Sequence, residues 1–225
     1  MARRKLIESL PDEAVSTDAF TKFRDADRSK KLILEVAGSE FAEHGLGGAR
    51  MARIAERANI DKKLIFYYFD NKERLYTEVL AEAYAKIRQA ESELHLSELE
   101  PSEAVCRLAE FTWNYYVDNP EFITFLNSEN LHRARHIRDF PNIRDLNSPL
   151  ISMLDAILKR GAEEGKFKQD VDPIQLYISI AALSYFYLSN NFTLSAIFGR
   201  DLLSPDARAE RLDHIKQIVL SYVTL

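Results

Sequence analysis

Apolar residues recur at helical spacing along most of the chain. Within residues 28–44, four apolar side chains fall on one face of a helix: Ile33, Val36, Ala37 and Phe41. No segment alternates apolar and polar residues as a half-buried strand would. Seven glycines and seven prolines are few interruptions for 225 residues. The pattern therefore predicts an all-α protein.

The same periodicity predicts eight further helices, at residues 51–58, 62–69, 71–94, 102–118, 120–137, 149–164, 173–197 and 205–223. Gly45 suits the left-handed residue that ends a helix, and Asp70 with Glu73 resembles a capping box. Four predicted helices begin at a proline that follows a capping residue: Asn119-Pro120, Ser148-Pro149, Asp172-Pro173 and Ser204-Pro205.

These elements divide the chain into three parts. Residues 1–27 have mixed charge and no periodicity, which predicts a flexible N-terminal arm. Residues 28–75 form a three-helix unit, and its last helix continues to about residue 94 as a link. Polar residues and Pro101 then mark a boundary, so residues 95–225 are predicted to form a C-terminal helical bundle.

The second and third helices have the spacing of a helix-turn-helix, whose second helix enters the major groove of DNA. Asn59 tolerates the positive φ of a tight turn, and Asp61 can cap the following helix. The net charge of −5, taken over the whole chain, is unfavourable for binding DNA. However, residues 45–74 hold seven basic against four acidic side chains, so the positive charge is local.

Residues 54–75, IAERANIDKKLIFYYFDNKERL, resemble the signature of the tetracycline repressor (TetR/AcrR) family. Six positions match its pattern: Ile54, Ala55, Ala58, Phe69, Lys72 and Leu75. Four positions depart from it. Asn59 replaces the turn glycine, Asp61 replaces a serine, and Lys63-Leu64 replace a Gly-Thr pair. The operator sequence therefore cannot be carried over from relatives.

The resemblance implies a ligand-responsive regulator, usually a repressor, that binds a palindromic double-stranded DNA operator as a homodimer. It also implies that the C-terminal bundle binds a small-molecule effector and forms the dimer through residues 173–197 and 205–223. By position, the expected DNA-contacting residues are Arg50, Lys62, Lys63, Tyr67, Tyr68 and Lys72. The alternative is a helical ligand-binding or scaffolding protein with a vestigial helix-turn-helix, in which these residues form only a solvated basic face.

Aromatic and amide side chains gather in three helices of the predicted bundle. Such residues usually form the core, but a pocket between helices needs the same apolar walls with a few oriented polar groups. The candidate ligand-binding residues are Phe111, Tyr115, Phe122, Asn127, Asn130, Arg133, Tyr177 and Tyr185. Because basic residues follow closely at 133–138, a small aromatic acid is the expected effector.

Other features point to no further chemistry. His132, His136 and Glu129 have metal-ligand spacing, but neighbouring arginines favour a solvated basic helix end. Residues 173–199 lack charge, yet their several polar side chains favour a buried helix over a membrane span. Cys106 is the only cysteine, which fits a reducing cytoplasm. We therefore expect no enzymatic activity, catalytic residue, metal or cofactor.

Overall fold

The computed structural model describes residues 17–140 and 143–225, and the described residues form ten α-helices and no strand. The helices are α1 (Thr17–Gly48), α2 (Met51–Ala58), α3 (Lys62–Phe69), α4 (Lys72–Ser92), α5 (Pro101–Asp118), α6 (Pro120–Leu131), α7 (Ile143–Glu163), α8 (Pro173–Ser189), α9 (Asn191–Phe198) and α10 (Pro205–Val223). Two short 3-10 helices lie at Leu96–Glu98 and Ile137–Asp139. The predicted all-α class is confirmed.

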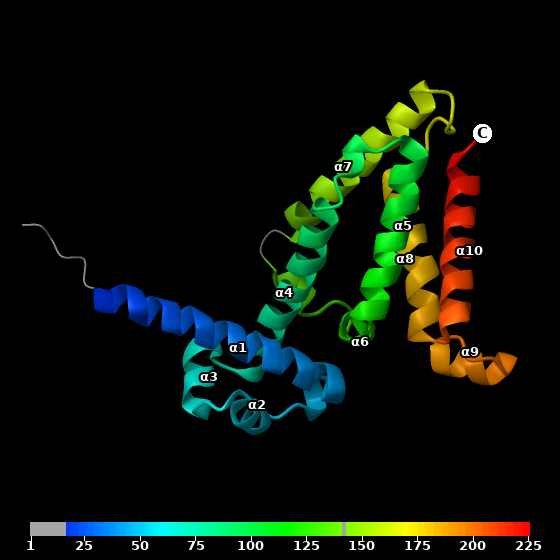
Figure 1. Cartoon of the computed structure of the whole chain (residues 1–225). Coiled ribbons are helices and arrows are strands. Elements are labelled where there is room, and N and C mark those ends of the chain that lie inside the picture. The colour runs from blue at the N-terminus through cyan, green and yellow to red at the C-terminus, as the bar shows by residue number, and fades with distance from the viewer. Residues whose placement is uncertain (1–16, 141–142) are drawn as a thin grey trace, which may run out of the picture.

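Helices α1, α2 and α3 form a compact N-terminal unit (Figure 1). Helix α4 begins in this unit and continues into the C-terminal bundle, which consists of α5 to α10. Within the bundle, α5 packs against α7, α8 and α10. Helix α6 packs back onto α1, so α4 and α6 both connect the bundle to the N-terminal unit.

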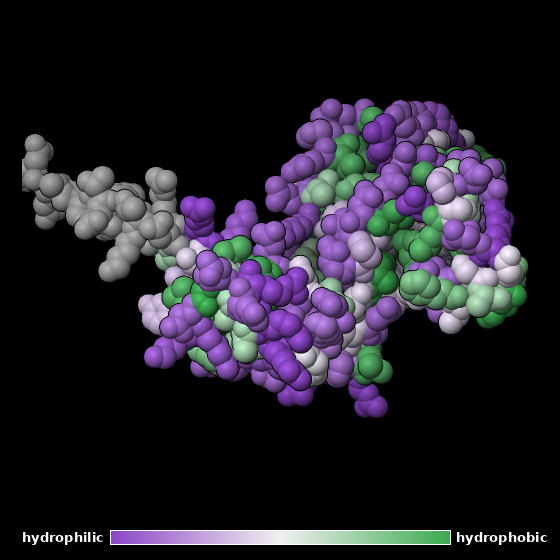
Figure 2. Space-filling view, turned by 60° about the horizontal axis from the view of Figure 1, so that its bottom comes forward, coloured by the Kyte–Doolittle hydropathy of each residue, from purple (hydrophilic) through white to green (hydrophobic). Residues whose placement is uncertain are grey.

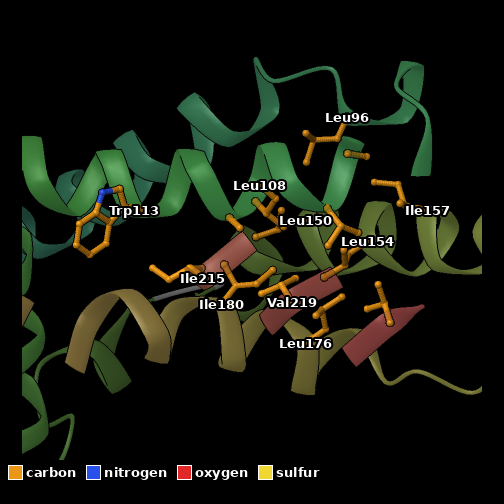
Figure 3. Close-up of a cluster of buried hydrophobic side chains, with 14 of the residues drawn as sticks. Leu96, Leu108, Trp113, Leu150, Leu154, Ile157, Leu176, Ile180, Ile215 and Val219 are labelled. Carbon is orange, nitrogen blue, oxygen red and sulfur yellow. The ribbon is translucent and has the colours of Figure 1, made fainter. Parts of the chain in front are cut away.

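Each part has its own hydrophobic core. The N-terminal core includes the fully buried side chains of Ile33, Phe41, Ile54, Ile65 and Phe69. The bundle core is larger and joins side chains from α5, α7, α8 and α10, as Figure 3 shows. Because burial of apolar surface is the dominant favourable term in folding, the two cores hold the two parts as separate but connected units.

The first helix is longer than the sequence pattern indicates. Helix α1 begins at Thr17 and not near Arg28, so residues 17–27 of the predicted flexible arm are helical. The rest of that arm, residues 1–16, lies outside the described residues. Gly45 interrupts α1 with φ 64° and ψ 171°, a conformation open to glycine, so the chain kinks at the predicted position, but ψ is not that of the predicted left-handed cap.

Two predicted helix boundaries in the bundle are wrong. Helix α6 ends at Leu131 and not at residue 137, because Arg133 and Ala134 adopt positive φ and turn the chain. Helix α7 begins at Ile143, so Pro149 lies inside the helix and not at its start. A proline inside a helix removes one backbone hydrogen bond, which is why the sequence favoured a later start.

The uncharged segment after Pro173 forms two helices where the pattern predicts one. Helix α8 ends at Ser189, and the side-chain amides of Asn190 and Asn191 donate to the carbonyls of Phe186 and Leu188. These bonds satisfy carbonyl groups that the end of a helix leaves without partners, so α9 begins separately. No helix in the described part of the chain is long and apolar enough to span a membrane.

The predicted helix caps are partly correct. Asp172 accepts from the backbone of Ile174, and Ser204 from Ala207. At the start of α4, however, Asn71 accepts from the amide of Arg74 and takes the role predicted for Asp70. Asn119 caps no following amide, and its side chain instead donates to the carbonyl of Tyr115 at the end of α5.

Candidate DNA-binding surface and effector site

Helices α2 and α3 form the predicted helix-turn-helix with the predicted boundaries. Asn59 adopts the left-handed conformation, with φ 53° and ψ 48°. The Asp61 carboxylate accepts from the amide of Lys63 at 2.8 Å and caps α3. Ile65 and Phe69 are buried on the inner face of α3, so the opposite face of this short helix is directed away from the core.

The outer face of α3 carries the side chains that the sequence assigns to DNA. Lys62 and Lys63 are exposed in its first turn, where the free helix amides also favour anions. Tyr67 is 80% exposed, and its ring makes an edge contact with Tyr68 at 5.3 Å between centroids. Figure 2 shows largely hydrophilic atoms over the N-terminal unit. The arrangement suits insertion of α3 into a major groove.

Lys72 and Arg50 lie where α4 and α2 begin. The Lys72 ammonium donates to the carbonyl of Ala49 at 3.3 Å, which joins the starts of the two helices. An ammonium group has three donors, so Lys72 keeps donors for a phosphate beside the two helix N-termini. The Arg50 side chain is exposed at the same edge of the unit.

A buried carboxylate holds these elements together, and the sequence analysis missed it. Glu40 of α1 is fully buried and accepts from the amide of Arg50 at 3.0 Å and from Nε of Arg53 at 2.8 Å. It thereby supplies the cap that α2 lacks from its own Arg50 side chain. The hydrogen bond from Arg53 lowers the pKa of Glu40 to about 2. Glu40 therefore stays ionised and fixes α2 on α1.

In the bundle, the structure brings together three aromatic members of the predicted ligand set, Phe111, Tyr115 and Phe122. Phe122 is buried, with ring centroids 5.8 Å from Tyr115 and 5.4 Å from Tyr84. Phe111 contacts Tyr115 at 5.7 Å. Tyr115 and Phe122 also border a cavity of about 560 Å³ between α1, α4 and α6. Their aromatic surface therefore forms core and part of a pocket wall at once.

The polar members of the predicted set lie elsewhere. Asn127 is exposed and accepts a hydrogen bond from the hydroxyl of Tyr185. Asn130 is also exposed and donates to the carbonyl of Leu126. Arg133 is exposed beyond the end of α6, at a positive φ of 58°. None of the three borders the aromatic cluster's cavity.

Tyr177, another residue of the predicted ligand set, contacts the ion pair of Arg88 and Glu91, which was not predicted from the sequence. Its hydroxyl accepts from Nη2 of Arg88 at 2.7 Å, and Nη1 of Arg88 lies 3.0 Å from Oε2 of Glu91. The Arg88 and Glu91 side chains are only 8% and 2% exposed. Burial raises the pKa of Glu91 to about 7, although Arg88 acts in the opposite direction. The pair borders a cavity of about 530 Å³ between α4 and α7.

The histidines considered as metal ligands have other partners. Glu129 is buried and binds the ring of His136 at 2.7 Å and the amide of Ile137 at 3.1 Å. Nδ1 of His132 lies 2.8 Å from the carbonyl of Ser128. Among the described residues, no group of three or more His, Cys, Asp or Glu is arranged to hold a metal ion. Glu129 therefore organises the loop after α6.

A helix-turn-helix with an exposed basic and aromatic recognition helix, joined by a linking helix to a separate bundle, defines a DNA-binding regulator. Comparison with known proteins gives the same result. Residues 33–79 match the model for bacterial regulatory proteins of the TetR family, and residues 101–219 match the tetracycline repressor-like C-terminal domain. The chain belongs to the TetR family, whose members are dimers that bind operators and small-molecule effectors.

Curated relatives cover nearly the whole chain. The transcriptional repressor NicS of Pseudomonas putida is 38% identical over 88% of this chain and 93% of its own length. The regulator RutR of Escherichia coli K12 is 25% identical over 88% of this chain and 91% of its own. These relatives are transcription factors, and NicS is similar across both the DNA-binding unit and the bundle.

Solved structures show the same fold. A TetR regulator from Chloroflexus aurantiacus has a TM-score of 0.65 and 15% identity, covering 90% of this chain and 99% of its own. The fatty acid degradation regulator FadR of Bacillus halodurans has a TM-score of 0.64 and 19% identity, covering 85% and 94%. The predicted family and two-part architecture are therefore confirmed.

Proposed function

We propose that two copies of this chain bind a palindromic operator as a repressor and release it when a small molecule binds in the bundle. The observation that carries the proposal is the outer face of α3, where Lys62, Lys63 and Tyr67 are exposed above a buried inner face. A helix-turn-helix that no longer bound DNA would not require exposed lysine and tyrosine side chains on this face. The repressor names of relatives such as NicS support the direction of control. Because such a protein acts on the chromosome, we place it in the cytoplasm.

The proposed dimer interface lies on α8 and α10. Helix α8 exposes an apolar stripe at Ile174, Ile178 and Phe186, which are 51%, 49% and 58% exposed. Helix α10 exposes Ile218 and Tyr222 one turn apart. Exposed apolar surface arranged in stripes on adjacent helices is typical of a subunit interface. Two copies would bury it in a four-helix contact around a two-fold axis.

Communication between the two parts is proposed to pass through Tyr76 of α4. Its buried ring contacts Phe41 of α1 at 5.1 Å and His136 at 4.9 Å, and its hydroxyl donates to Ser128 of α6 at 3.2 Å. A ligand can shift the equilibrium only by binding one arrangement of the parts better than the other. A movement of α4 in the bundle would shift α1 through the contact between Tyr76 and Phe41. The spacing of the two DNA-binding units in the dimer would then change.

The effector is proposed to be a small aromatic acid held in the bundle. Aromatic side chains such as Phe122 and Tyr115 favour flat apolar ligands. The exposed position of Arg133 gives no support to the basic segment after α6 as the anchor for the acid. An anchor inside the bundle is therefore needed, and Arg88 is a buried cation beside the separate cavity between α4 and α7, which Tyr115 and Phe122 do not border.

Replacing Lys72 with alanine is expected to weaken binding to all DNA sequences by a similar factor. The substitution removes one phosphate contact, so the slope of log affinity against log salt should fall by about one unit. Fluorescence anisotropy with operator and random DNA at several salt concentrations measures both effects. Lys159→Ala is the control, because Lys159 is a 70% exposed lysine on α7 of the bundle. An unchanged salt slope in Lys72→Ala would remove this residue from the interface.

Replacing Lys63 or Tyr67 with alanine is expected to weaken operator binding more than random binding. Loss of one base contact should reduce the difference between the two by about 1–3 kcal/mol. The same anisotropy titrations give this difference directly. Equal losses on operator and random DNA would assign both residues to the phosphate backbone and contradict their role in sequence recognition.

A further inference from the structure

The ion pair between Arg88 and Glu91 is buried, which is unusual for charged side chains. Both residues lie on α4, one turn apart, and their side chains are almost completely buried. The aromatic ring of Tyr177 lies under the guanidinium at 5.4 Å, and its hydroxyl accepts from Nη2. Burial of a charged pair is costly unless each group also has good hydrogen bonds.

Those hydrogen bonds are incomplete. Nη1 of Arg88 is close to Oε2 of Glu91, but the geometry is that of an ion pair and not of a hydrogen bond. Nε and Nη1 of Arg88 and both carboxylate oxygens of Glu91 have no hydrogen-bond partner among the described residues. An unsatisfied buried polar group destabilises the folded state, and a charged group does so more strongly. The site therefore has donors that a further group can satisfy.

Arg88 and Glu91 border the cavity between α4 and α7, and their unsatisfied atoms are buried, so a ligand reaches the guanidinium only when Glu91 moves away. Its volume of about 530 Å³ is in the range of small-molecule sites. The two helices pack against each other, as Figure 1 shows. The wall from α7 is apolar and consists of Pro149, Leu150 and Met153. The wall from α4 is mostly polar and consists of Ala85, Arg88, Gln89, Glu91 and Ser92. The cavity thus combines an apolar wall with a polar wall that holds the only two charged residues among its described lining residues.

We infer that Arg88 anchors the carboxylate of a small organic acid in this cavity, and that the acid takes the place of Glu91 on the guanidinium. The inference rests on the proposed function, since it identifies the effector's anchor. A carboxylate can accept from two guanidinium nitrogens at once, which is a strong and directional pair. Nη1 faces Glu91, and Nη2 donates only one of its two hydrogens to Tyr177, so an acid in the place of Glu91 can accept from Nη1 and from the second hydrogen of Nη2 on the same edge of the guanidinium.

The pair favours an acid over a cation because its two members respond differently to burial. An arginine cannot lose its proton in a protein, whereas a carboxyl group can take one up. The pKa of Glu91 is raised to about 7, and the other titratable groups around the pair are the tyrosines Tyr84, Tyr115, Tyr116 and Tyr177, all with raised pKa values. These phenols stay neutral near pH 7. When Glu91 becomes protonated, the remaining charge is positive and attracts an anion.

The test uses matched carboxylates and amides as probes: benzoate, cinnamate and hexanoate against benzamide, cinnamamide and hexanamide, with benzamidine as the cation. Thermal shift and calorimetry on the full-length chain should show that at least one carboxylate binds more than tenfold tighter than its amide. Binding should strengthen as the pH falls from 8 to 6, because Glu91 then takes up a proton. The result that overturns the inference is an amide or benzamidine that binds as well as every carboxylate.

Variants locate the anchor. Arg88→Met should reduce carboxylate affinity at least tenfold, and Glu91→Gln should retain carboxylate binding while losing its pH dependence. The double variant Arg88→Met/Glu91→Gln leaves no orphan buried charge, so it remains informative if the single variant unfolds. Lys86→Met is the control, because Lys86 is 61% exposed on the same helix. Unchanged carboxylate affinity in the double variant would overturn the assignment.

Operator binding without any ligand separates this inference from the proposed function. The acid should release the wild-type protein and the Lys86→Met control from the operator but should not release the double variant. If the wild-type chain binds carboxylates through Arg88 and never binds an operator, the proposed function fails and the anchor stands. If operator binding is normal and the carboxylate preference survives without Arg88, the anchor fails and the function stands.

Discussion

Replacing Ile178 with glutamate is expected to give a monomer that binds operator about 100-fold more weakly, or weaker still. Ile178 lies in the middle of the exposed apolar stripe on α8, between Ile174 and Phe186. In a two-fold interface each substituted position occurs twice, so two carboxylates enter one apolar contact. Burial of unpaired charge is costly enough to separate the subunits.

DNA affinity is expected to fall because the two DNA-binding units are no longer joined in one dimer. In a dimer, binding of one DNA-binding unit places the second at a high effective concentration near its half-site, which raises affinity by about 10²–10⁴-fold. Sedimentation velocity and operator titration measure the two effects separately. Leu131→Glu is the control, because Leu131 is 80% exposed at the end of α6 and is not part of the apolar stripe on α8. A dimeric Ile178→Glu variant with full operator affinity would place the interface elsewhere.

Replacing Glu40 with glutamine is expected to lower the free energy of unfolding by about 2–3 kcal/mol, the range for hydrogen bonds to charged groups. The carboxylate binds both the Arg53 guanidinium and the amide of Arg50, and a neutral amide satisfies them poorly. Urea unfolding measures the change. The matched control is Glu43→Gln, since Glu43 is 63% exposed one turn away. Equal stability of the Glu40 and Glu43 variants would contradict the anchoring role.

The same carboxylate predicts how stability changes with pH. The pKa of Glu40 falls from an ordinary value of 4.5 to about 2 on folding, because Arg53 and the Arg50 amide stabilise the ionised form. A lowered pKa contributes stability that is complete above about pH 4.5 and is lost as the pH falls toward 2. Glu40→Gln should remove this acid dependence. An equally steep loss of stability in both proteins over that range would assign it to other carboxylates.

Local signals were sufficient for the helix-turn-helix. The boundaries of α2 and α3 follow from residues within the segment itself, namely the turn residue Asn59 and the cap Asp61. Such short-range interactions are visible in the sequence because both partners lie within a few residues of each other. The exposed positions of Lys62, Lys63 and Tyr67 follow from the same periodicity.

Boundaries set by tertiary contacts could not be predicted in this way. Helix α6 stops at Leu131 where the buried carboxylate of Glu129 binds the chain at His136 and Ile137. Nothing in the periodicity indicates that this carboxylate is buried. The start of α4 was misassigned by one residue, because Asp70 and Asn71 are both good caps and only the backbone geometry distinguishes them.

The sequence nevertheless contains a signal for Glu40 and Glu91, the two buried carboxylates that were not predicted. Glu40 follows Ile33 by seven positions and Ala37 by three, so it continues the apolar face of its helix. Glu91 follows Ile87 by four positions and continues the inner stripe of α4 in the same way. A charged residue at a position of an apolar stripe is expected to be buried and to bind a partner. The sequence cannot identify a partner that comes from another helix, as Tyr177 of α8 does for Arg88, the residue paired with Glu91.

Operator recognition by a dimer can be tested by selecting bound DNA from a random pool and counting the chains per bound DNA by mass. We expect enrichment of one inverted repeat, with chains bound in multiples of two and half-site spacing fixed by the dimer. Lys63→Ala should select the same spacing with relaxed sequence at the contacted base. Recovery of no enriched sequence, or of a site without inverted symmetry bound by a single chain, would contradict a dimeric operator-binding regulator.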